Sequence, residues 1–591
     1  MIVYEWCSLV CKKILCISQP KPENTEYEPL FADIERQAVN KLIEYFENRS
    51  QVNFYEGEPL QALSTLAYSG HPELQRSAAI AFSEVSETEI QPVSREALEP
   101  ILYLLQSPDI EVQRGASAAL GNLAVDPKNK LLIVNIGGLE PLIRQMLSPN
   151  KEAQCNAVGC ITNLATADEN KAKIAKSGAL IPLARLAKSN DIRVQKNATG
   201  ALLNMTHSAE NRQQLVIAGA VHVLVSLLDA QDVDVRYYST TAVSNIAVDA
   251  GNRIQLQQSE PTLLPKLINL MTASEPKIAA QAALALRNLA SDDDYQYTIV
   301  RNNALPSLKK MLISSDAHMV LASIACLRNL SIHPDNERPI LEAGFLQPIV
   351  NLLDNEYNLG EISCHAISTL RNLSASSDST KISLVELGVL PRIYANLAND
   401  RVSLISKSEM TAALAVLALC DSLKPVILQS NFLEVLIPLS LESDSVDVVG
   451  NSAAAIGNLS AHIVDYTPFL KAWNGGQKLG QPTSSGGLAS YIIMLLSKDS
   501  EPTLVQIGVW TLLQFVESGN QDLIHLISLN QTIKSLLNQI ATDYANIEED
   551  STSYDIKKSP SESHSRQSSS VSEESNFYIS SIASKVLQQL D

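Results

Sequence analysis

The chain has 591 residues, a formal net charge of −19 and 45% hydrophobic residues, so it can bury a large core. This acidic balance disfavours DNA and RNA, and we predict no nucleic-acid partner. No run of about 18 uncharged apolar residues occurs, and the first residues lack a secretory apolar core, so we expect no membrane-spanning helix.

An N-terminal segment, residues 1–32, precedes the first regular helical pattern. It holds three of the eight cysteines, Cys7, Cys11 and Cys16. All eight are too scattered for a disulfide scaffold or a CxxC-type zinc site, so we expect no metal and no cofactor. We interpret the other five as small core residues: Cys155, Cys160, Cys326, Cys364 and Cys420.

From residue 33 onward, one phrase recurs at a fixed step. It reads "ALGNLA", "CITNLA", "ALLNMT", "AVSNIA", "ALRNLA", "CLRNLS" and "TLRNLS", with gaps of 41, 41, 41, 43, 41 and 43 residues between its asparagines. We call these asparagines the asparagine row: Asn122, Asn163, Asn204, Asn245, Asn288, Asn329 and Asn372.

A second phrase keeps the same step. It begins with a glycine that suits a turn of positive φ, and in every case except Gly219 a proline follows three or four residues later, within the first turn of the next helix. The glycines are Gly138, Gly178, Gly219, Gly344 and Gly388. Apolar residues at helical spacing fill the segments between, and no strand pattern persists.

A period of about 40 residues made of helices predicts an all-α fold, a right-handed superhelical solenoid of armadillo or HEAT type. The glycine turn and the "NLA" phrase favour armadillo. We expect about 11 to 12 repeats over residues 33–541, with an inserted loop near 474–487. Outside the regular phrases we place Glu84, Ala418, Asn458 and Gln514 in the asparagine position.

Two segments follow the solenoid. Residues 542–575 are rich in Ser, Asp and Glu, which predicts a disordered, phosphorylatable tail. Residues 576–591 predict an amphipathic helix. This helix either docks on a groove or is a frayed terminal helix.

The asparagine row indicates a binding surface. In a solenoid the same position of each repeat faces one concave groove, and an amide both donates to and accepts from an extended peptide backbone. Seven residues earlier a second polar set shares the face: Asn156, Asn197, Tyr238, Gln281 and His365. The alternative is that each asparagine bonds its own helix end or an inter-repeat loop.

Arginines directly precede three of these asparagines. Arg287, Arg328 and Arg371, here called the arginine row, predict a positive stripe for acidic side chains of a partner. The alternative is that each arginine pairs with an acid of the adjacent repeat.

Other functional classes fit less well. Importin-α-type receptors carry Trp four residues before Asn, but here only Trp510 with Gln514 approximates that pair. No GxxxxGK[ST], GxSxG or HExxH motif occurs, so we predict no enzyme. A structural spacer would leave the asparagine row without a role.

The phrases "GNLAVDPKNKLLIVNIGGLEPLI", "QCNAVGCITNLAT" and "RVQKNATGALLNMTHSAENRQQLV" closely resemble the fungal vacuolar armadillo protein, the vacuole-membrane adaptor of yeasts. The resemblance implies a peripheral protein on the cytosolic face of the vacuole whose groove binds extended partner segments. Implied partners are an outer-nuclear-membrane junction protein, a myosin V cargo adaptor and an autophagy-initiation scaffold subunit.

The implied processes are nucleus–vacuole junctions, vacuole inheritance, vacuole fusion and selective autophagy, including cytoplasm-to-vacuole targeting. In the family the arginine row contacts the junction partner. Weak self-association stays open, as does the alternative of a generic armadillo adaptor of importin-α or β-catenin type with nuclear or junctional partners.

The sequence departs from the family at its start. Relatives begin with Met-Gly followed by cysteines, which permits myristoylation plus palmitoylation, whereas residue 2 here is Ile2. Either the native start differs, or anchoring depends on palmitoylation of Cys7, Cys11 and Cys16. Another interpretation leaves these cysteines unmodified.

Overall fold

The computed structural model describes residues 32–354, 360–473, 486–497, 499–552 and 566–590. Across these ranges the regular elements are helices and no strand occurs, which confirms the all-α prediction. The chain divides into two units, Met1–Leu289 and Ala290–Asp591, here called unit 1 and unit 2.

Unit 1 contains the helices α2 (Asp33–Glu47), η1 (Arg49–Gln51), α3 (Gly57–Ala67), α4 (Pro72–Thr88), α5 (Arg95–Leu104), α6 (Ile110–Leu123), α7 (Pro127–Asn135), α8 (Leu139–Met146), α9 (Lys151–Leu164), α10 (Asp168–Lys176), α11 (Leu180–Leu186), α12 (Ile192–Met205), α13 (Ala209–Ile217), α14 (Ala220–Leu227), α15 (Val233–Ile246), α16 (Ala250–Ser259), α17 (Leu263–Leu270) and α18 (Pro276–Leu289).

Unit 2 contains α19 (Asp293–Arg301), α20 (Leu305–Leu312), α21 (Ala317–Leu330), α22 (Pro334–Glu342), α23 (Leu346–Asn351), α24 (Glu361–Ser374), α25 (Asp378–Glu386), α26 (Val389–Leu397), α27 (Leu404–Leu417), α28 (Lys424–Gln429), α29 (Leu433–Glu442), α30 (Val446–Ser460), α31 (Thr467–Ala472), α32 (Leu488–Leu495), α33 (Pro502–Glu517), α34 (Gln521–Leu529), α35 (Gln531–Thr552) and α36 (Arg566–Leu590).

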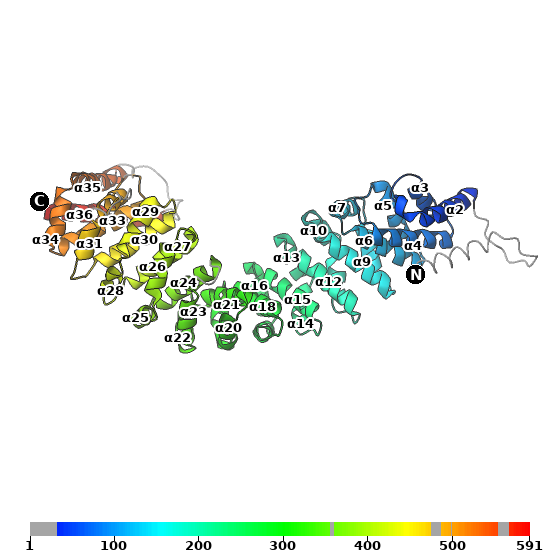
Figure 1. The fold of residues 1–591 in the computed structure, drawn as a ribbon, viewed down its shortest axis with the longest axis horizontal. Coiled ribbons are helices and arrows are strands. Elements are labelled where there is room, and N and C mark those ends of the chain that lie inside the picture. The colour runs from blue at the N-terminus through cyan, green and yellow to red at the C-terminus, as the bar shows by residue number, and fades with distance from the viewer. Residues whose placement is uncertain (1–31, 355–359, 474–485, 498, 553–565, 591) are drawn as a thin grey trace, which may run out of the picture. The chain divides into compact units, whose positions relative to one another are not determined.

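Most repeats consist of two short helices and a longer final helix. The final helices of unit 1 are α4, α6, α9, α12, α15 and α18, and each packs on the next (Figure 1). Those of unit 2 are α21, α24, α27, α30, α33 and α36, which also pack in series. Each unit is therefore an armadillo-type stack.

Local sequence explains where the final helices begin. Asp109, Asn150 and Asp191 are the N-caps of α6, α9 and α12, and their side chains accept hydrogen bonds from backbone N–H groups of the first turn. Such caps satisfy donors that the helix itself leaves unpaired. The N-cap residues of the final helices therefore recur with the period of the repeat.

The core follows from the residue after each member of the asparagine row. All seven of these residues are fully buried: Leu123, Leu164, Met205, Ile246, Leu289, Leu330 and Leu373. Each contributes about 1.5 to 3 kcal/mol by leaving water. The asparagines themselves are half-buried, so each asparagine and the apolar residue after it mark the boundary between surface and core.

The glycine turns need one correction. Gly178, Gly219, Gly344 and Gly388 have positive φ as predicted, but in "IGGLEPL" the left-handed residue is Gly137 (φ 89°), and Gly138 has φ −64°. A Cβ on Gly138 would lie 2.7 Å from the Ile133 carbonyl oxygen. Gly138 is thus required for a close approach, not for the turn.

Two turns of unit 2 use asparagine where the glycine phrase is missing. Asn303 (φ 63°) precedes α20, and Asn431 (φ 58°) precedes α29. Asparagine tolerates the left-handed region better than other residues with a side chain. The turn therefore recurs without the glycine that marks it elsewhere.

The C-terminal helix α36 packs against α33 and α35. Ile579, Ala583 and Val586 are fully buried there, and Ser580 Oγ donates to the Ala541 carbonyl at 2.9 Å. Helices α35 and α36 enter the range 542–575 from its two ends, and residues 553–565 lie outside the described residues. The expected anchor segment, residues 1–32, lies outside them except for its last residue, and the expected loop at 474–487 except for its last two.

Candidate functional site

The final helices position the asparagine row at equivalent places. Each member is the penultimate residue of its helix, except Asn372, which is the third from the end of α24. All seven side chains are half-buried. Asn122, Asn163, Asn204, Asn245 and Asn288 belong to unit 1, and Asn329 and Asn372 belong to unit 2.

The amide nitrogens of the row reach the end of the preceding final helix. Asn163 Nδ2 donates to the Gly121 carbonyl at 3.1 Å, Asn204 Nδ2 to the Thr162 carbonyl at 3.1 Å, and Asn288 Nδ2 to the Ser244 carbonyl at 2.9 Å. Asn458, outside the row, donates in the same way to Ala415 at 3.0 Å.

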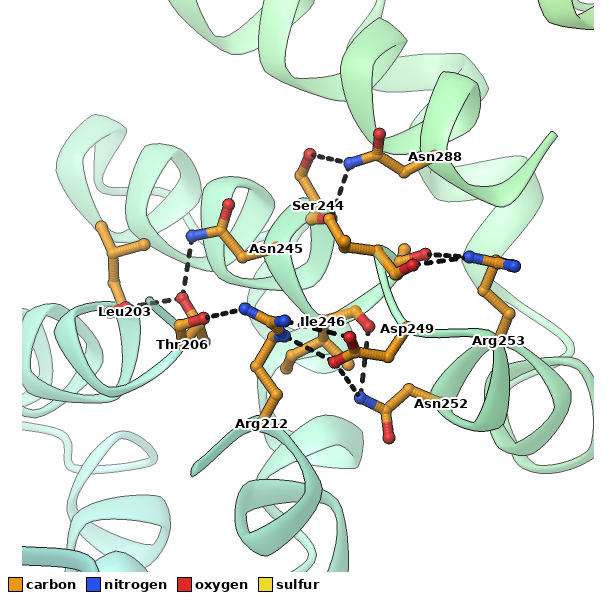
Figure 2. Close-up of polar contacts among 12 residues, drawn as sticks. Leu203, Thr206, Arg212, Ser244, Asn245, Ile246, Asp249, Asn252, Arg253 and Asn288 are labelled. Carbon is orange, nitrogen blue, oxygen red and sulfur yellow. Dashed lines mark hydrogen bonds and ion pairs between the residues drawn. The ribbon is translucent and has the colours of Figure 1, made fainter. Parts of the chain in front are cut away.

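Some members use a nearby hydroxyl instead. Asn122 Nδ2 donates to Ser86 Oγ at 3.1 Å, and Asn245 Nδ2 donates to Thr206 Oγ1 at 2.9 Å. Figure 2 shows one example of each kind of acceptor: Asn245 donates to the Thr206 hydroxyl, and Asn288 donates to the Ser244 carbonyl. Asn372 donates to Ser331 Oγ at 3.1 Å.

These bonds give the asparagine row a structural role. The last carbonyls of a helix have no partner within that helix. In α6 the neighbouring carbonyls of Leu120 and Asn122 accept backbone N–H groups beyond the helix end, whereas Gly121 accepts the Asn163 amide. An amide carries two N–H donors and one oxygen, so each bond leaves further donor and acceptor capacity for a ligand.

One position assigned from sequence is wrong by two residues. Because Asn458 bonds the Ala415 carbonyl, the equivalent of the asparagine position in α27 is Val416 and not Ala418. Val416 is half-buried like the row, whereas Ala418 is fully buried. The spacing of the repeat changes here, and without an asparagine the sequence offers no marker.

The second polar set makes similar bonds. Asn156 Nδ2 donates to the Arg114 carbonyl and Asn197 Nδ2 to the Cys155 carbonyl, both at 3.4 Å. Asn451 in α30, which sequence analysis did not include, donates to the Ser408 carbonyl at 3.1 Å. In α9, α12 and α30, a side-chain amide therefore donates a hydrogen bond to a backbone carbonyl of the preceding final helix.

A third periodic set was missed from sequence. Asn129 donates to the Leu123 carbonyl at 3.1 Å, Asn170 to Leu164 at 3.2 Å and Asn336 to Leu330 at 2.9 Å. These side chains are at most 1% exposed, so they close the previous helix and cannot meet a partner. The signal was the phrase "KNK", "ENK" or "DNE" at the same period.

Unit 1 neutralises several cations of its final helices internally. Arg76 Nη2 lies 2.5 Å from Asp109, Arg114 Nη1 lies 3.6 Å from Glu152, and Arg236 Nη2 lies 3.5 Å from Glu275. In each pair the acid comes from the start of the next final helix or its cap. Arginines that are paired in this way hold repeats together.

The arginine row divides between the units. Arg287 in α18 of unit 1 is half-buried, as are Arg328 in α21 and Arg371 in α24 of unit 2. Arg371 Nη1 lies 3.0 Å from Glu409 Oε2 in α27. The Arg328 guanidinium makes no ion pair or hydrogen bond with the described part of the chain, so it is available to an acidic group.

The cysteines near this site are not reactive thiolates. Burial, together with the Glu409 carboxylate, raises the pKa of the Cys364 thiol, and burial raises the pKa of Cys155 and of Cys160. A raised thiol pKa keeps the nucleophilic form scarce at neutral pH. No metal-binding cluster occurs among the residues that the structure describes.

Comparisons with known proteins agree with this geometry. The model of the Armadillo/beta-catenin-like repeat matches residues 90–125, 126–166, 167–207 and 208–248. "Vacuolar protein 8" of Schizosaccharomyces pombe is 58% identical over 526 residues, covering 89% of this chain and 93% of that protein. The chain belongs to the Vacuolar protein 8 family.

Further relatives of the Vacuolar protein 8 family support this assignment. "Vacuolar protein 8" of Saccharomyces cerevisiae is 56% identical, covering 85% of each chain, and that of Candida albicans is 56% identical, covering 90% and 89%. The resemblance stated from sequence is thereby confirmed. The chain is a vacuolar armadillo-repeat scaffold and not an enzyme.

Solved structures show the same fold. A structure from work on a phosphorylation switch in the interaction between cadherin and beta-catenin has a TM-score of 0.66 at 15% identity, covering 90% of this chain and 99% of that chain. An engineered protein has a TM-score of 0.62 at 29% identity, covering 68% and 99%. The likeness to the first structure, together with the matched repeat model, confirms the armadillo prediction.

Two further observations on this member of the Vacuolar protein 8 family concern its association with a membrane. No helix within the described ranges has the length and apolarity needed to cross a bilayer. The lipidation candidates Cys7, Cys11 and Cys16 lie outside the described residues.

Proposed function

We propose that this protein is an adaptor on the cytosolic face of the vacuole that binds extended partner segments along the final helices of its units. The observation that carries the proposal is Arg328, a half-buried guanidinium that makes no ion pair or hydrogen bond with the described residues of a protein of net charge −19. A carboxylate bound there forms a charge-assisted hydrogen bond, which is about twice as strong as a neutral one.

The amides beside it supply the second layer of the proposal. Asn372 Nδ2 donates to Ser331 Oγ and to the Arg328 carbonyl of the preceding repeat, and its amide oxygen matches the N–H groups that an extended backbone leaves unpaired. The amides of unit 1 from Asn122 to Asn288 have oxygens at equivalent positions, and Arg287 carries a positive charge next to Asn288. Partner side chains then provide selectivity through the arginines.

Family membership suggests which partners to test. We propose an outer-nuclear-membrane junction protein, a myosin V cargo adaptor and an autophagy-initiation scaffold subunit. The corresponding processes are nucleus–vacuole junctions, vacuole inheritance, vacuole fusion and selective autophagy with cytoplasm-to-vacuole targeting. A generic importin-α-like role fits less well, because Trp510 alone occupies the tryptophan position and Arg328 repels a basic cargo.

We further propose that the membrane anchor is acylation of Cys7, Cys11 and Cys16. Two lipid signals are needed for stable anchoring, and three neighbouring cysteines supply more than one acyl site.

Affinity capture from the organism's own lysate tests the adaptor role. Full-length wild-type protein and Arg328→Ala are immobilised in parallel, and Arg338→Ala is the control because Arg338 is exposed and pairs with Glu342 within α22, which is not a final helix. We expect Arg328→Ala to lose the three proposed partners while Arg338→Ala retains them. Equal recovery on all three baits would contradict the proposed role of Arg328.

A further inference from the structure

The ion pair between Arg371 and Glu409 joins two consecutive final helices of unit 2, α24 and α27. Arg371 Nη1 lies 3.0 Å from Glu409 Oε2, and the two side chains are 31% and 19% exposed. Both therefore reach the surface of the final helices on which the partner segment is proposed to lie. One half of the positive charge of unit 2's arginine row is already matched internally.

The geometry of this pair indicates that it can be displaced. Glu409 Oε2 is buried, yet among the described residues it accepts no well-aligned hydrogen bond. Attraction between the two charges holds it in place without the directional bonds that make bidentate pairs strong. A partly exposed ion pair of this kind is worth about 0 to 1 kcal/mol.

Arg328 lies close to the same group of side chains. The Asn372 amide, adjacent to Arg371, donates to the Arg328 carbonyl at 3.4 Å. The Cys364 thiol interacts electrostatically with Glu409, Arg328 and Arg371 together. Within its described residues, unit 2 thus presents one guanidinium that makes no ion pair or hydrogen bond, beside a second one that the Glu409 carboxylate occupies.

We propose that Glu409 is a built-in competitor of acidic partners, occupying on Arg371 the position that a partner's carboxylate takes in the bound state. The inference rests on the proposed function. A partner segment with one acidic side chain binds Arg328 and leaves the internal pair intact. A segment with two acidic side chains displaces Glu409 and gains Arg371, so Glu409 sets the acidity that a partner needs.

Calorimetric titration of the full chain tests this competition. The probes are the cytosolic segment of the organism's junction partner as a synthetic peptide and the same peptide with each Asp and Glu changed to its amide. Glu409→Gln keeps the shape and removes the charge. Glu342→Gln is the matched control, because it removes one negative charge from the exposed Arg338–Glu342 pair in unit 2.

We expect Glu409→Gln to raise the affinity for the acidic peptide by about two- to fivefold, the equivalent of an ion pair of this exposure. The affinity of Glu409→Gln for the amidated peptide should equal that of wild type. The affinity of Glu342→Gln for the acidic peptide should also equal that of wild type. Affinity should also fall more steeply with added salt in Glu409→Gln, because Arg371 then joins the screened contacts.

The double variant separates competition from a general effect of charge. Arg371→Ala should weaken binding only about twofold in the wild type but about tenfold in the Glu409→Gln background, because Arg371 contributes fully only without its internal partner. Unchanged or reduced affinity in Glu409→Gln, or an equal gain in Glu342→Gln, would overturn the inference. Failure of the proposed function is distinct: Arg328→Ala would then bind as well as wild type.

Discussion

The bond between consecutive final helices can be tested at Asn163. Its Nδ2 donates to the Gly121 carbonyl at the end of α6, which accepts no other hydrogen bond from the described residues. Asn163→Ala removes the bond, and we expect a loss of about 1 to 2 kcal/mol in the free energy of unfolding, one hydrogen bond plus an unsatisfied carbonyl.

Asn163→Asp is the sharper perturbation. It keeps the shape but replaces the N–H donor with a carboxylate oxygen opposite the Gly121 oxygen, and it adds negative charge at the negative end of α9. We expect a loss of about 2 to 4 kcal/mol, because the repulsion adds to the missing bond.

Hydrogen–deuterium exchange of the full chain measures this loss where it arises. Each repeat contacts only its neighbours, so protection should fall in α6 and α9 and stay constant in unit 2. Asn269→Ala is the control, because Asn269 is exposed and its side chain makes no hydrogen bond within the described residues. If Asn163→Asp exchanged like this control, the asparagine row would not hold repeats together.

Three other predictions follow from the structure and the proposal. Lys424, whose side chain is 4% exposed, lies 2.6 Å from Asp421 and lowers the pKa of that carboxyl, so Asp421→Asn should reduce stability in thermal melts at neutral pH. The difference from wild type should vanish as the pH falls through the lowered pKa, because wild-type Asp421 then loses its charge too; a constant difference would exclude this linkage. Val586→Asp should free α36 and increase its proteolysis, whereas Gln588→Asp, at an exposed position of the same helix, should not. Replacing Cys7, Cys11 and Cys16 with Ser should move the fluorescently tagged protein from the vacuole rim to the cytosol without loss of folding. A persistent rim signal would show that the anchor lies elsewhere in the chain.

The repeat architecture was predictable because local chemistry repeats with the fold. The step of 41 to 43 residues recorded the stacking of one three-helix repeat on the next. Glycine marked left-handed turns, and a buried Leu, Ile or Met after each asparagine marked the core. These signals are local, so a single sequence reveals them.

The bonds of the site were not predictable to the same degree. Sequence places Asn163 on a helix face, but its partner is the Gly121 carbonyl, and backbone carbonyls have no sequence signature. Pairing of Arg371 with Glu409 likewise depends on side chains 38 residues apart that meet only after stacking. In α27 the asparagine position was assigned to Ala418 instead of Val416, because no polar residue marks it in the sequence.

The most direct test of the adaptor proposal is calorimetric titration of the junction-partner peptide against wild type, Arg328→Ala and Arg338→Ala, with helicity checked for each. A charge-assisted contact is worth about 1.5 to 3 kcal/mol, so Arg328→Ala should weaken binding by about tenfold or more, with Arg338→Ala at the wild-type affinity. Added salt should weaken the wild-type complex. Unchanged affinity of a folded Arg328→Ala variant would show that partners bind on another surface.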